Sequence, residues 1–77
     1  MTTPLPQSPQ IQAVLQLKHV QEADRQMWVT EDTKTVADHV MIARENGGLV
    51  SVHRIRGMEA IEFTFDPSAF VAVEVAR

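Results

Sequence analysis

Residues 30–48 read TEDTKTVADHVMIARENGG, and this stretch predicts an amphipathic helix over about residues 33–45. Thr30-Glu31-Asp32-Thr33 is rich in N-cap residues, and its two acids suit the positive end of the helix dipole. Asn46-Gly47-Gly48 ends the helix, because glycine readily adopts the left-handed C-cap conformation. Apolar residues recur at spacings of three and four and mark the buried stripe: Val36, Ala37, Val40, Met41 and Ala43.

Three strands are predicted after this helix. They cover residues 49–55 (LVSVHRI), 60–65 (AIEFTF) and 70–75 (FVAVEV), each rich in β-branched or aromatic residues. Arg56-Gly57-Met58 forms a hairpin turn, and Asp66-Pro67-Ser68 forms a turn with proline at its second position. Alternation places Ile61, Phe63 and Phe65 on one face of their strand, and Val71, Val73 and Val75 on one face of theirs.

The segment before the helix is ambiguous. In residues 11–20, IQAVLQLKHV, the residues Ile11, Ala13, Leu15 and Leu17 alternate as in a half-buried strand. A helix starting at Ser8-Pro9 is the alternative, with a stripe of Ile11, Val14, Leu15 and Val20. We favour the strand. Residues 21–24 then read as a polar turn, and residues 25–30, RQMWVT, as a short second strand.

The predicted order is β-β-α-β-β-β, an α+β fold. One helix cannot cover both faces of a five-stranded sheet, so we expect a strongly curved antiparallel sheet or small open barrel with one helix. A flatter sheet stacked on a second copy is the alternative. Residues 1–10, MTTPLPQSPQ, are expected to be a disordered or extended N-terminal arm, and residues 11–77 a single small domain.

Composition narrows the classes of function. The chain has 77 residues, 10 acidic and 7 basic side chains, a net charge of -3 and no cysteine. Disulfides and cysteine-based metal sites are therefore excluded. No run of apolar residues is long enough to cross a membrane and no secretory signal is present, so we expect a cytoplasmic protein. Because a core this small supplies roughly 3–5 kcal/mol, oligomerisation is an expected source of further stability.

No residue pattern typical of catalysis, cofactor binding or metal binding is present. His19, His39 and His53 lack the spacing of metal ligands, and no nucleophile elbow surrounds Ser51 or Ser68. Gly47-Gly48 follows a helix, the reverse of a phosphate-binding loop. We therefore predict no catalytic, cofactor or metal residues and no enzyme activity; a site assembled between subunits stays open.

The favoured function is a small structural or interaction protein that acts as a homo-oligomer or as an accessory subunit of a larger, bacterial or phage, assembly. Strands 59–65 and 70–75 are candidates for pairing between subunits, because an unprotected strand edge accepts another strand. The expected interface anchors are the large aromatic residues: Trp28, Phe63, Phe65 and Phe70.

The alternative function is a small nucleic-acid-binding regulator that uses a basic hairpin. It requires four residues to form one surface: Lys18, His53, Arg54 and Arg56. The net charge of -3 opposes binding to phosphate, so nucleic acid is not the expected partner.

One resemblance adds to these predictions. Val50 to Glu74 runs strand, glycine turn, strand, and then Asp66-Pro67 before an apolar strand ending in Glu74. This stretch resembles the small β-rich domain of certain flagellar assembly proteins and of short phage or bacterial proteins of unknown role. Arg25 to Val40 is similar to their hairpin followed by an acid-capped helix, although the two halves occur here in swapped order. The resemblance implies a barrel-like fold and a non-enzymatic accessory role, and it implies no site residues.

Overall fold

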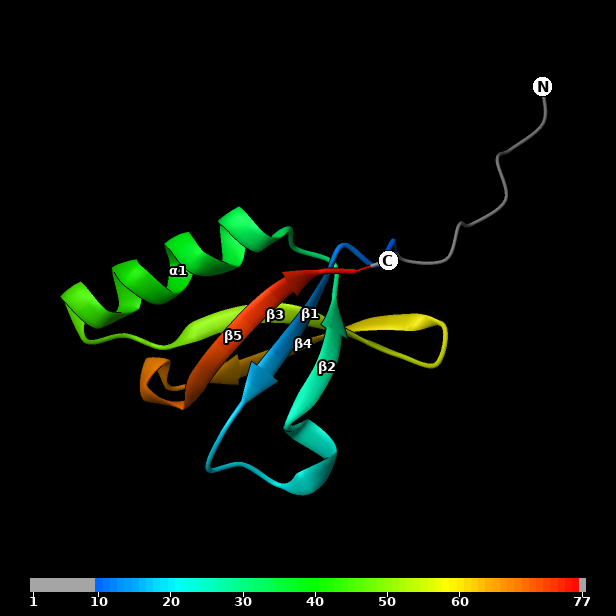
Figure 1. Cartoon of the computed structure of the whole chain (residues 1–77), viewed down its shortest axis with the longest axis horizontal. Helices are drawn as coiled ribbons and strands as arrows, with labels where there is room; N and C mark the ends of the chain where they lie inside the picture. The colour runs from blue at the N-terminus through cyan, green and yellow to red at the C-terminus, as the bar shows by residue number, and fades with distance from the viewer. Residues whose placement is uncertain (1–9, 77) are drawn as a thin grey trace.

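The computed structural model describes residues 10–76, so the predicted arm lies outside the described residues except for Gln10. The predicted α+β fold with the order β-β-α-β-β-β is confirmed (Figure 1). Two short 3-10 turns, η1 and η2, lie between strands. The elements are β1 (Ala13–Leu17), η1 (Glu22–Asp24), β2 (Gln26–Val29), α1 (Thr33–Asn46), β3 (Val50–Arg56), β4 (Glu59–Phe65), η2 (Pro67–Ala69) and β5 (Phe70–Val75).

The ends of α1 are set by the residues predicted to cap it. The Asp32 carboxylate accepts a hydrogen bond from the Thr35 backbone N–H at 2.7 Å, and Gly47 adopts the left-handed conformation with φ of 72°. Val36, Val40 and Ala43 are buried. Ala37 and Met41, predicted to share this stripe, are exposed instead. The helix therefore contacts the sheet along a narrower strip than its apolar pattern predicts.

Within the segment 11–20, Ala13–Leu17 form a strand, as favoured, and no helix is present there. Ala13, Leu15 and Leu17 are buried on one face of β1, in the alternating pattern of a half-buried strand. β1 lies between two antiparallel neighbours, β2 and β5. This interior position in the sheet explains why its inward side chains are so completely enclosed.

The five strands form one antiparallel sheet in the order β4-β3-β2-β1-β5. A flat sheet of five strands would separate its edges by about 19 Å. The chain nevertheless passes from the edge strand β4 to the opposite edge strand β5 through Asp66 and the three residues of η2. Because a 3-10 turn rises only about 2 Å per residue, this link is too short for a flat sheet. The sheet is therefore strongly curved.

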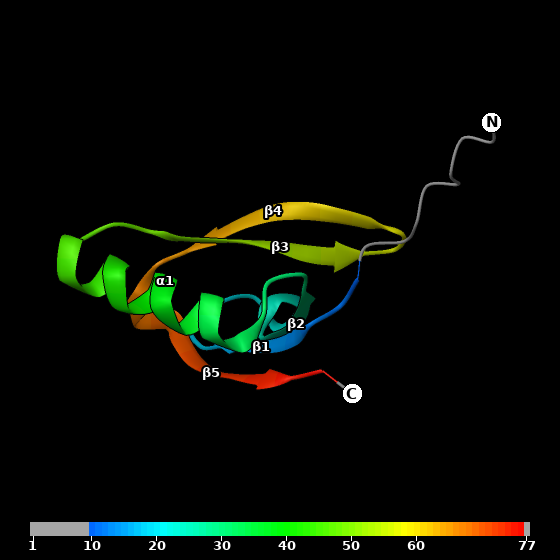
Figure 2. The ribbon, with the colours of Figure 1, turned by 90° about the horizontal axis from the view of Figure 1, so that it is seen from above.

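The helix fills the concave side of the curved sheet. α1 packs on β3, β5 and η2, although β3 and β5 are separated by two other strands. Figure 2 shows β3 and β4 on one side of the molecule and β5 on the other. The buried core lies between them, with Leu15, Val29, Val36, Val50 and Val52 as its largest fully enclosed side chains. The sheet stays open, because β4 and β5 do not pair.

Two predicted strand faces differ from the structure. On β5, Val71 and Val75 are exposed and only Val73 of the three packs against the core. A bulge between the Gln16↔Ala72 and Leu17↔Phe70 pairs displaces Val71 and brings Phe70 onto the core, whereas Val75 is exposed at the end of this edge strand. On β4, Phe65 is buried but Ile61 is 42% exposed. The β3–β4 hairpin extends beyond the helix, so the predicted inner face of β4 loses its cover toward the turn (Figure 1).

Candidate interaction surface

Arg54 points toward the interior of the curved sheet. It lies on the same face of β3 as the buried Val50 and Val52. Its guanidinium donates a 2.6 Å hydrogen bond to the Asp24 carboxylate and lies 5.4 Å from the centre of the Phe63 ring. The side chain is 14% exposed. Arg54 therefore forms an ion pair within the fold, and little of its charge faces solvent.

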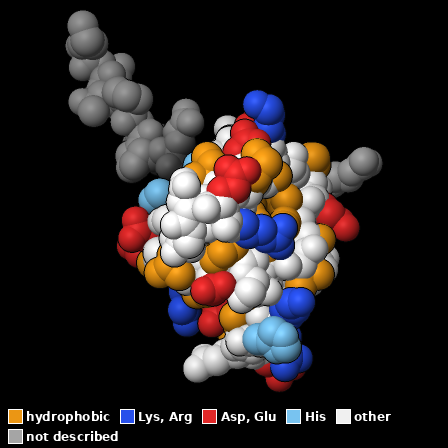
Figure 3. All heavy atoms as spheres, turned by 90° about the vertical axis from the view of Figure 1, so that its left-hand side faces the viewer, with side chains coloured by type: hydrophobic (Ala, Val, Ile, Leu, Met, Phe, Trp, Pro, Cys, Tyr) orange, Lys and Arg blue, Asp and Glu red, His pale blue; other side chains and the backbone are white. Residues whose placement is uncertain are grey.

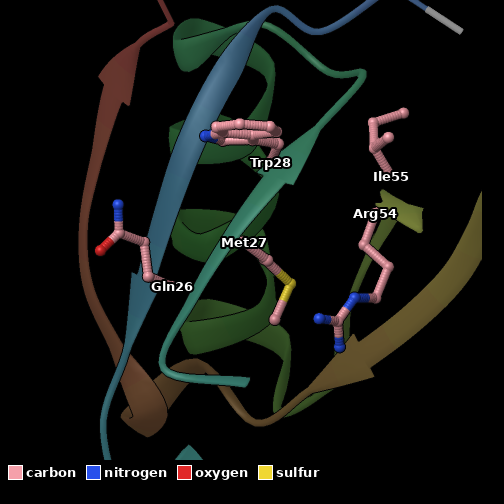
Figure 4. A pocket seen from close by; sticks show the side chains of 5 residues that line it. All are labelled: Gln26, Met27, Trp28, Arg54 and Ile55. Carbon is pink, nitrogen blue, oxygen red and sulfur yellow. The ribbon is translucent and has the colours of Figure 1, made fainter. Parts of the chain in front are cut away.

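This ion pair spans a gap between β2 and β3. β2 and β3 have a single registered pair, Val29↔Arg54, after which the two strands diverge. The resulting cleft, of about 380 Å³, is lined by Gln26, Met27, Trp28, Arg54 and Ile55 (Figure 4). The Arg54–Asp24 ion pair links β3 to the η1 turn across the open end of this cleft. The ion pair thus holds β3 and η1 together where β2 and β3 lack backbone pairing.

His53 lies on the opposite, outer face of β3 and is held by Glu31. The Glu31 carboxylate accepts the His53 backbone N–H at 3.0 and 3.2 Å, and its Oε2 lies 2.8 Å from His53 Nδ1. Glu31 precedes α1, so this contact joins the start of the helix to β3. Burial alone raises the pKa of Glu31, but the bonds from His53 outweigh it and the pKa is lowered. The hydrogen bond to Glu31, reinforced by its charge, raises the pKa of His53.

The Glu31–His53 contact should make stability depend on pH. A raised His53 pKa stabilises the fold below the ordinary histidine value of 6.5, and this effect is lost as the pH rises through the raised pKa. A lowered Glu31 pKa stabilises the fold above its ordinary value of 4.5, and this effect is lost as the pH falls through the lowered pKa. The contribution is therefore greatest between those two ordinary values.

Thermal melts of the wild type and of His53→Gln at about pH 5.5 and about pH 8.5 check this window. We expect the substitution to lower the melting temperature more at the acidic value than at the alkaline one. His39→Gln, on the exposed surface of α1, is the matched control and should show no such difference. Equal losses from His53→Gln at both values would contradict the prediction.

The four residues of the predicted nucleic-acid patch do not form one surface. Arg54 points inward and His53 outward from the same strand. The Lys18 backbone N–H bonds to the Ala69 carbonyl in η2, which places Lys18 near the start of β3, whereas Arg56 ends that strand at the hairpin. The side of the molecule in Figure 3 also intersperses acidic, basic and apolar side chains. No concentrated basic field for phosphate results from this placement.

The predicted aromatic anchors are also separated. Phe65 is a core residue, 5% exposed, and is enclosed within the chain itself. Phe63 and Phe70 are partly buried against the core, and the Phe63 and Phe65 rings stack 6.3 Å apart. Trp28 is 54% exposed on the outer face of β2. Of the four, Trp28 is the one that the described fold leaves largely uncovered.

The hairpin tip is an exposed apolar surface that the sequence reasoning missed. Met58 is 77% exposed at the turn, and Ile61 follows on β4. The tip forms because Gly57 adopts a φ of 64°, which closes a two-residue turn between Arg56 and Glu59. The available signal was an apolar residue placed directly in a hairpin turn, where polar residues are usual.

Outer edges remain on both sides of the sheet. Within residues 10–76, β4 pairs only with β3, and β5 pairs only with β1. The same part of the chain contains no group of three potential metal ligands, and its helix is too short and too polar to cross a membrane. The β2–β3 cleft brings no acid, base and nucleophile together, because the titratable group that lines it is Arg54, which is engaged with Asp24.

Comparisons with family models, with curated proteins and with solved structures give no match to this chain. The resemblance to small flagellar-assembly and phage domains therefore stays a prediction.

Proposed function

We propose that this chain is a non-enzymatic interaction protein that self-associates by pairing the free edges of two β4 strands. The observation that carries the proposal is the β3–β4 hairpin, which extends past the helix and leaves one edge of β4 unpaired within the described residues. Natural proteins usually shield such an edge, because it accepts a strand from another chain. Here an exposed Ile61 lies on it.

Backbone geometry specifies which groups face the free edge. The turn has two residues, so the closing pair Arg56↔Glu59 exchanges both of its backbone hydrogen bonds. Alternate residues then direct their N–H and C=O groups away from β3. Ala60, Glu62 and Thr64 therefore present donors and acceptors to the free edge, where a second strand would bind.

The side chains favour one register for the paired strands. If the two-fold axis passes through Ile61, this residue opposes its own copy and Glu62 opposes Ala60, so no acids face each other directly. If the axis passes through Glu62, two carboxylates oppose each other, which is destabilising. The register centred on Ile61 also makes Ala60 and Glu62 the hydrogen-bonded pair, as the backbone geometry requires. The pairing is isologous and closes at a dimer.

The oligomeric mass tests this proposal. Light scattering coupled to size-exclusion chromatography should give a dimer for the wild type at micromolar concentration and a monomer for Ile61→Lys, because the substitution opposes two cations across the axis. Val71→Lys is the matched control. It places the same charge at an exposed apolar residue of the other edge strand, β5, and should leave the dimer intact.

A second variant separates backbone pairing from side-chain contact. Glu62→Pro removes a donor that faces the free edge and leaves the bonds to β3 in place, so it should also give a folded monomer. A monomeric wild type, or a dimer that survives both Ile61→Lys and Glu62→Pro, would overturn the proposal. A dimer broken by Val71→Lys alone would assign the interface to β5.

The nucleic-acid-binding alternative draws no support from the placement of its residues. It needs Lys18, His53, Arg54 and Arg56 to act together, and Arg54 is held by Asp24 inside the curve of the sheet. Accessory binding to a larger partner protein stays compatible with the β4 edge, because a partner strand would use the same donors and acceptors.

A further inference from the structure

Trp28 is an exposed aromatic residue on the outer face of the sheet, on the side away from the helix. Figure 4 shows its indole lying across β1, while the neighbouring Met27 points the other way. Its partner across the strands is Val14. Together with Ile11 and Ala76, these two residues line a shallow cleft of about 320 Å³, which we call the Trp28 cleft. A tryptophan that is 54% exposed beside three apolar neighbours forms an uncovered apolar surface.

The residues outside the described structure carry the chemistry that fits this cleft. Positions 4–9 read PLPQSP, with prolines at 4, 6 and 9 and no charged side chain. Proline-rich segments favour the polyproline II conformation, and their rings and apolar side chains bind in grooves lined by aromatic residues at a low entropic cost. This segment enters the described structure at Gln10, directly before Ile11, which itself lines the Trp28 cleft.

The length of the segment matches the distance to be covered. From Gln10 to Val14 the chain takes four residue steps along or beside β1, about 13 Å. A polyproline II segment rises about 3.1 Å per residue, so four steps back from Gln10 cover about 12 Å. A segment that reverses at Gln10 therefore brings Pro6 level with Val14 and Trp28, and Pro9 beside Ile11.

Polar groups for the backbone of such a segment also lie on this face. A polyproline II chain has no internal hydrogen bonds, so its carbonyl groups need external donors. Gln16 and Gln26 form the next cross-strand pair beyond Val14 and Trp28 and lie on the same outer face. Their carboxamides, with the indole N–H, are suitable donors.

We propose that residues 4–9 of the chain bind in its own Trp28 cleft, with Pro6 against the indole and Pro9 against Ile11. The proposal goes beyond the β4 pairing and does not depend on it, since the Trp28 cleft and the β4 edge belong to different strands. Binding of residues 4–9 would give the N-terminal segment an intramolecular partner and would make the Trp28 cleft unavailable to other proteins.

Fluorescence of the full chain tests the proposal at a single residue. Trp28 is the one tryptophan of the sequence and tyrosine is absent, so the emission reports on this cleft alone. In the wild type we expect weak quenching by acrylamide. In the double variant Pro6→Ser/Pro9→Ser we expect about a twofold higher quenching constant and a red-shifted emission, because the half-exposed indole face is then uncovered.

The matched control is Thr2→Ala/Thr3→Ala, which alters the same segment outside positions 4–9 and should behave as the wild type. All these substitutions lie outside the described fold, and circular dichroism checks that it is retained. Equal quenching of the wild type and the double proline variant would overturn the proposal. Protection that disappears on dilution would also overturn it, because the cover would then come from a second copy.

The result can be distinguished from failure of the β4 dimer. Ile61→Lys removes the dimer contact and leaves the Trp28 cleft untouched, so the low quenching of Trp28 should persist in this monomer. High quenching in the monomer, with low quenching in the dimer, would assign the cover of Trp28 to the subunit interface instead of residues 4–9.

Discussion

Replacing Leu15 with alanine is expected to leave the chain largely unfolded at physiological temperature. Leu15 is fully enclosed on the interior strand β1 and belongs to the single core cluster of the described residues. Truncation of a buried leucine to alanine costs about 2–5 kcal/mol. Because a domain of this size is stabilised by only about 3–5 kcal/mol, the loss consumes most or all of its stability. Urea titration followed by circular dichroism measures the change.

The matched control is Val14→Ala, at the adjacent position of the same strand but on its outer face. Val14 is only partly buried, so the loss should be about 1 kcal/mol or less. A Leu15→Ala variant with the same urea midpoint as the Val14→Ala variant would contradict the prediction. It would also mean that the concave side of the sheet is not the core.

Removing the charge of Asp24 is expected to have the second largest effect. The variant Asp24→Asn leaves the Arg54 guanidinium, mostly enclosed by the fold, without its anion. Loss of one partner of a fully buried ion pair costs about 3–5 kcal/mol. Since both side chains keep some contact with solvent, we expect about 2 kcal/mol, or roughly 10 °C in melting temperature.

A double-mutant cycle isolates the contact itself. Arg54 Nε is buried without a hydrogen-bond partner among the described residues, so the pair is incompletely compensated. Arg54→Met removes the cost of burying the guanidinium. The double variant Arg54→Met/Asp24→Asn should therefore be more stable than the sum of the two single losses predicts, by about 1–2 kcal/mol. The control is Lys34→Met, which breaks the exposed Lys34–Asp38 pair and should cost less than about 0.5 kcal/mol. Additive losses at Arg54 and Asp24 would refute the coupling.

The elements that sequence reasoning located well are those with local determinants. α1 spans Thr33–Asn46 against a predicted 33–45, because an acid side chain caps its start and a glycine in the left-handed conformation ends it. The β3–β4 hairpin was found because Gly57 fits a tight turn. In each case the deciding residue is adjacent in the chain to the feature it determines, so no knowledge of the tertiary contacts is needed.

What escaped prediction depends on contacts between distant residues. Arg54 belongs to a strand face that alternation alone identifies as inward, yet an arginine is expected outside. Asp24 lies 30 residues away and makes the inward position tolerable. Likewise, the bulge between Ala72 and Phe70 removes Val71 from the core face of β5 and places Phe70 there. The candidate interaction surface was predicted least well, because the exposure of Trp28 and the enclosure of Phe65 follow from the curvature of the sheet.

The pairing of β1 with β5 has a mechanical consequence. Ala13 lies opposite Val75, and the Ala76 N–H bonds to the Gln12 carbonyl, so both ends of the described chain leave from the same corner. A force applied to the two ends would break the hydrogen-bonded pairs between β1 and β5 one after another, instead of loading all of them at once. A force applied to the two ends should therefore unfold the protein at a low load. A linker that joined the two ends would impose little strain on the fold, because they already lie side by side.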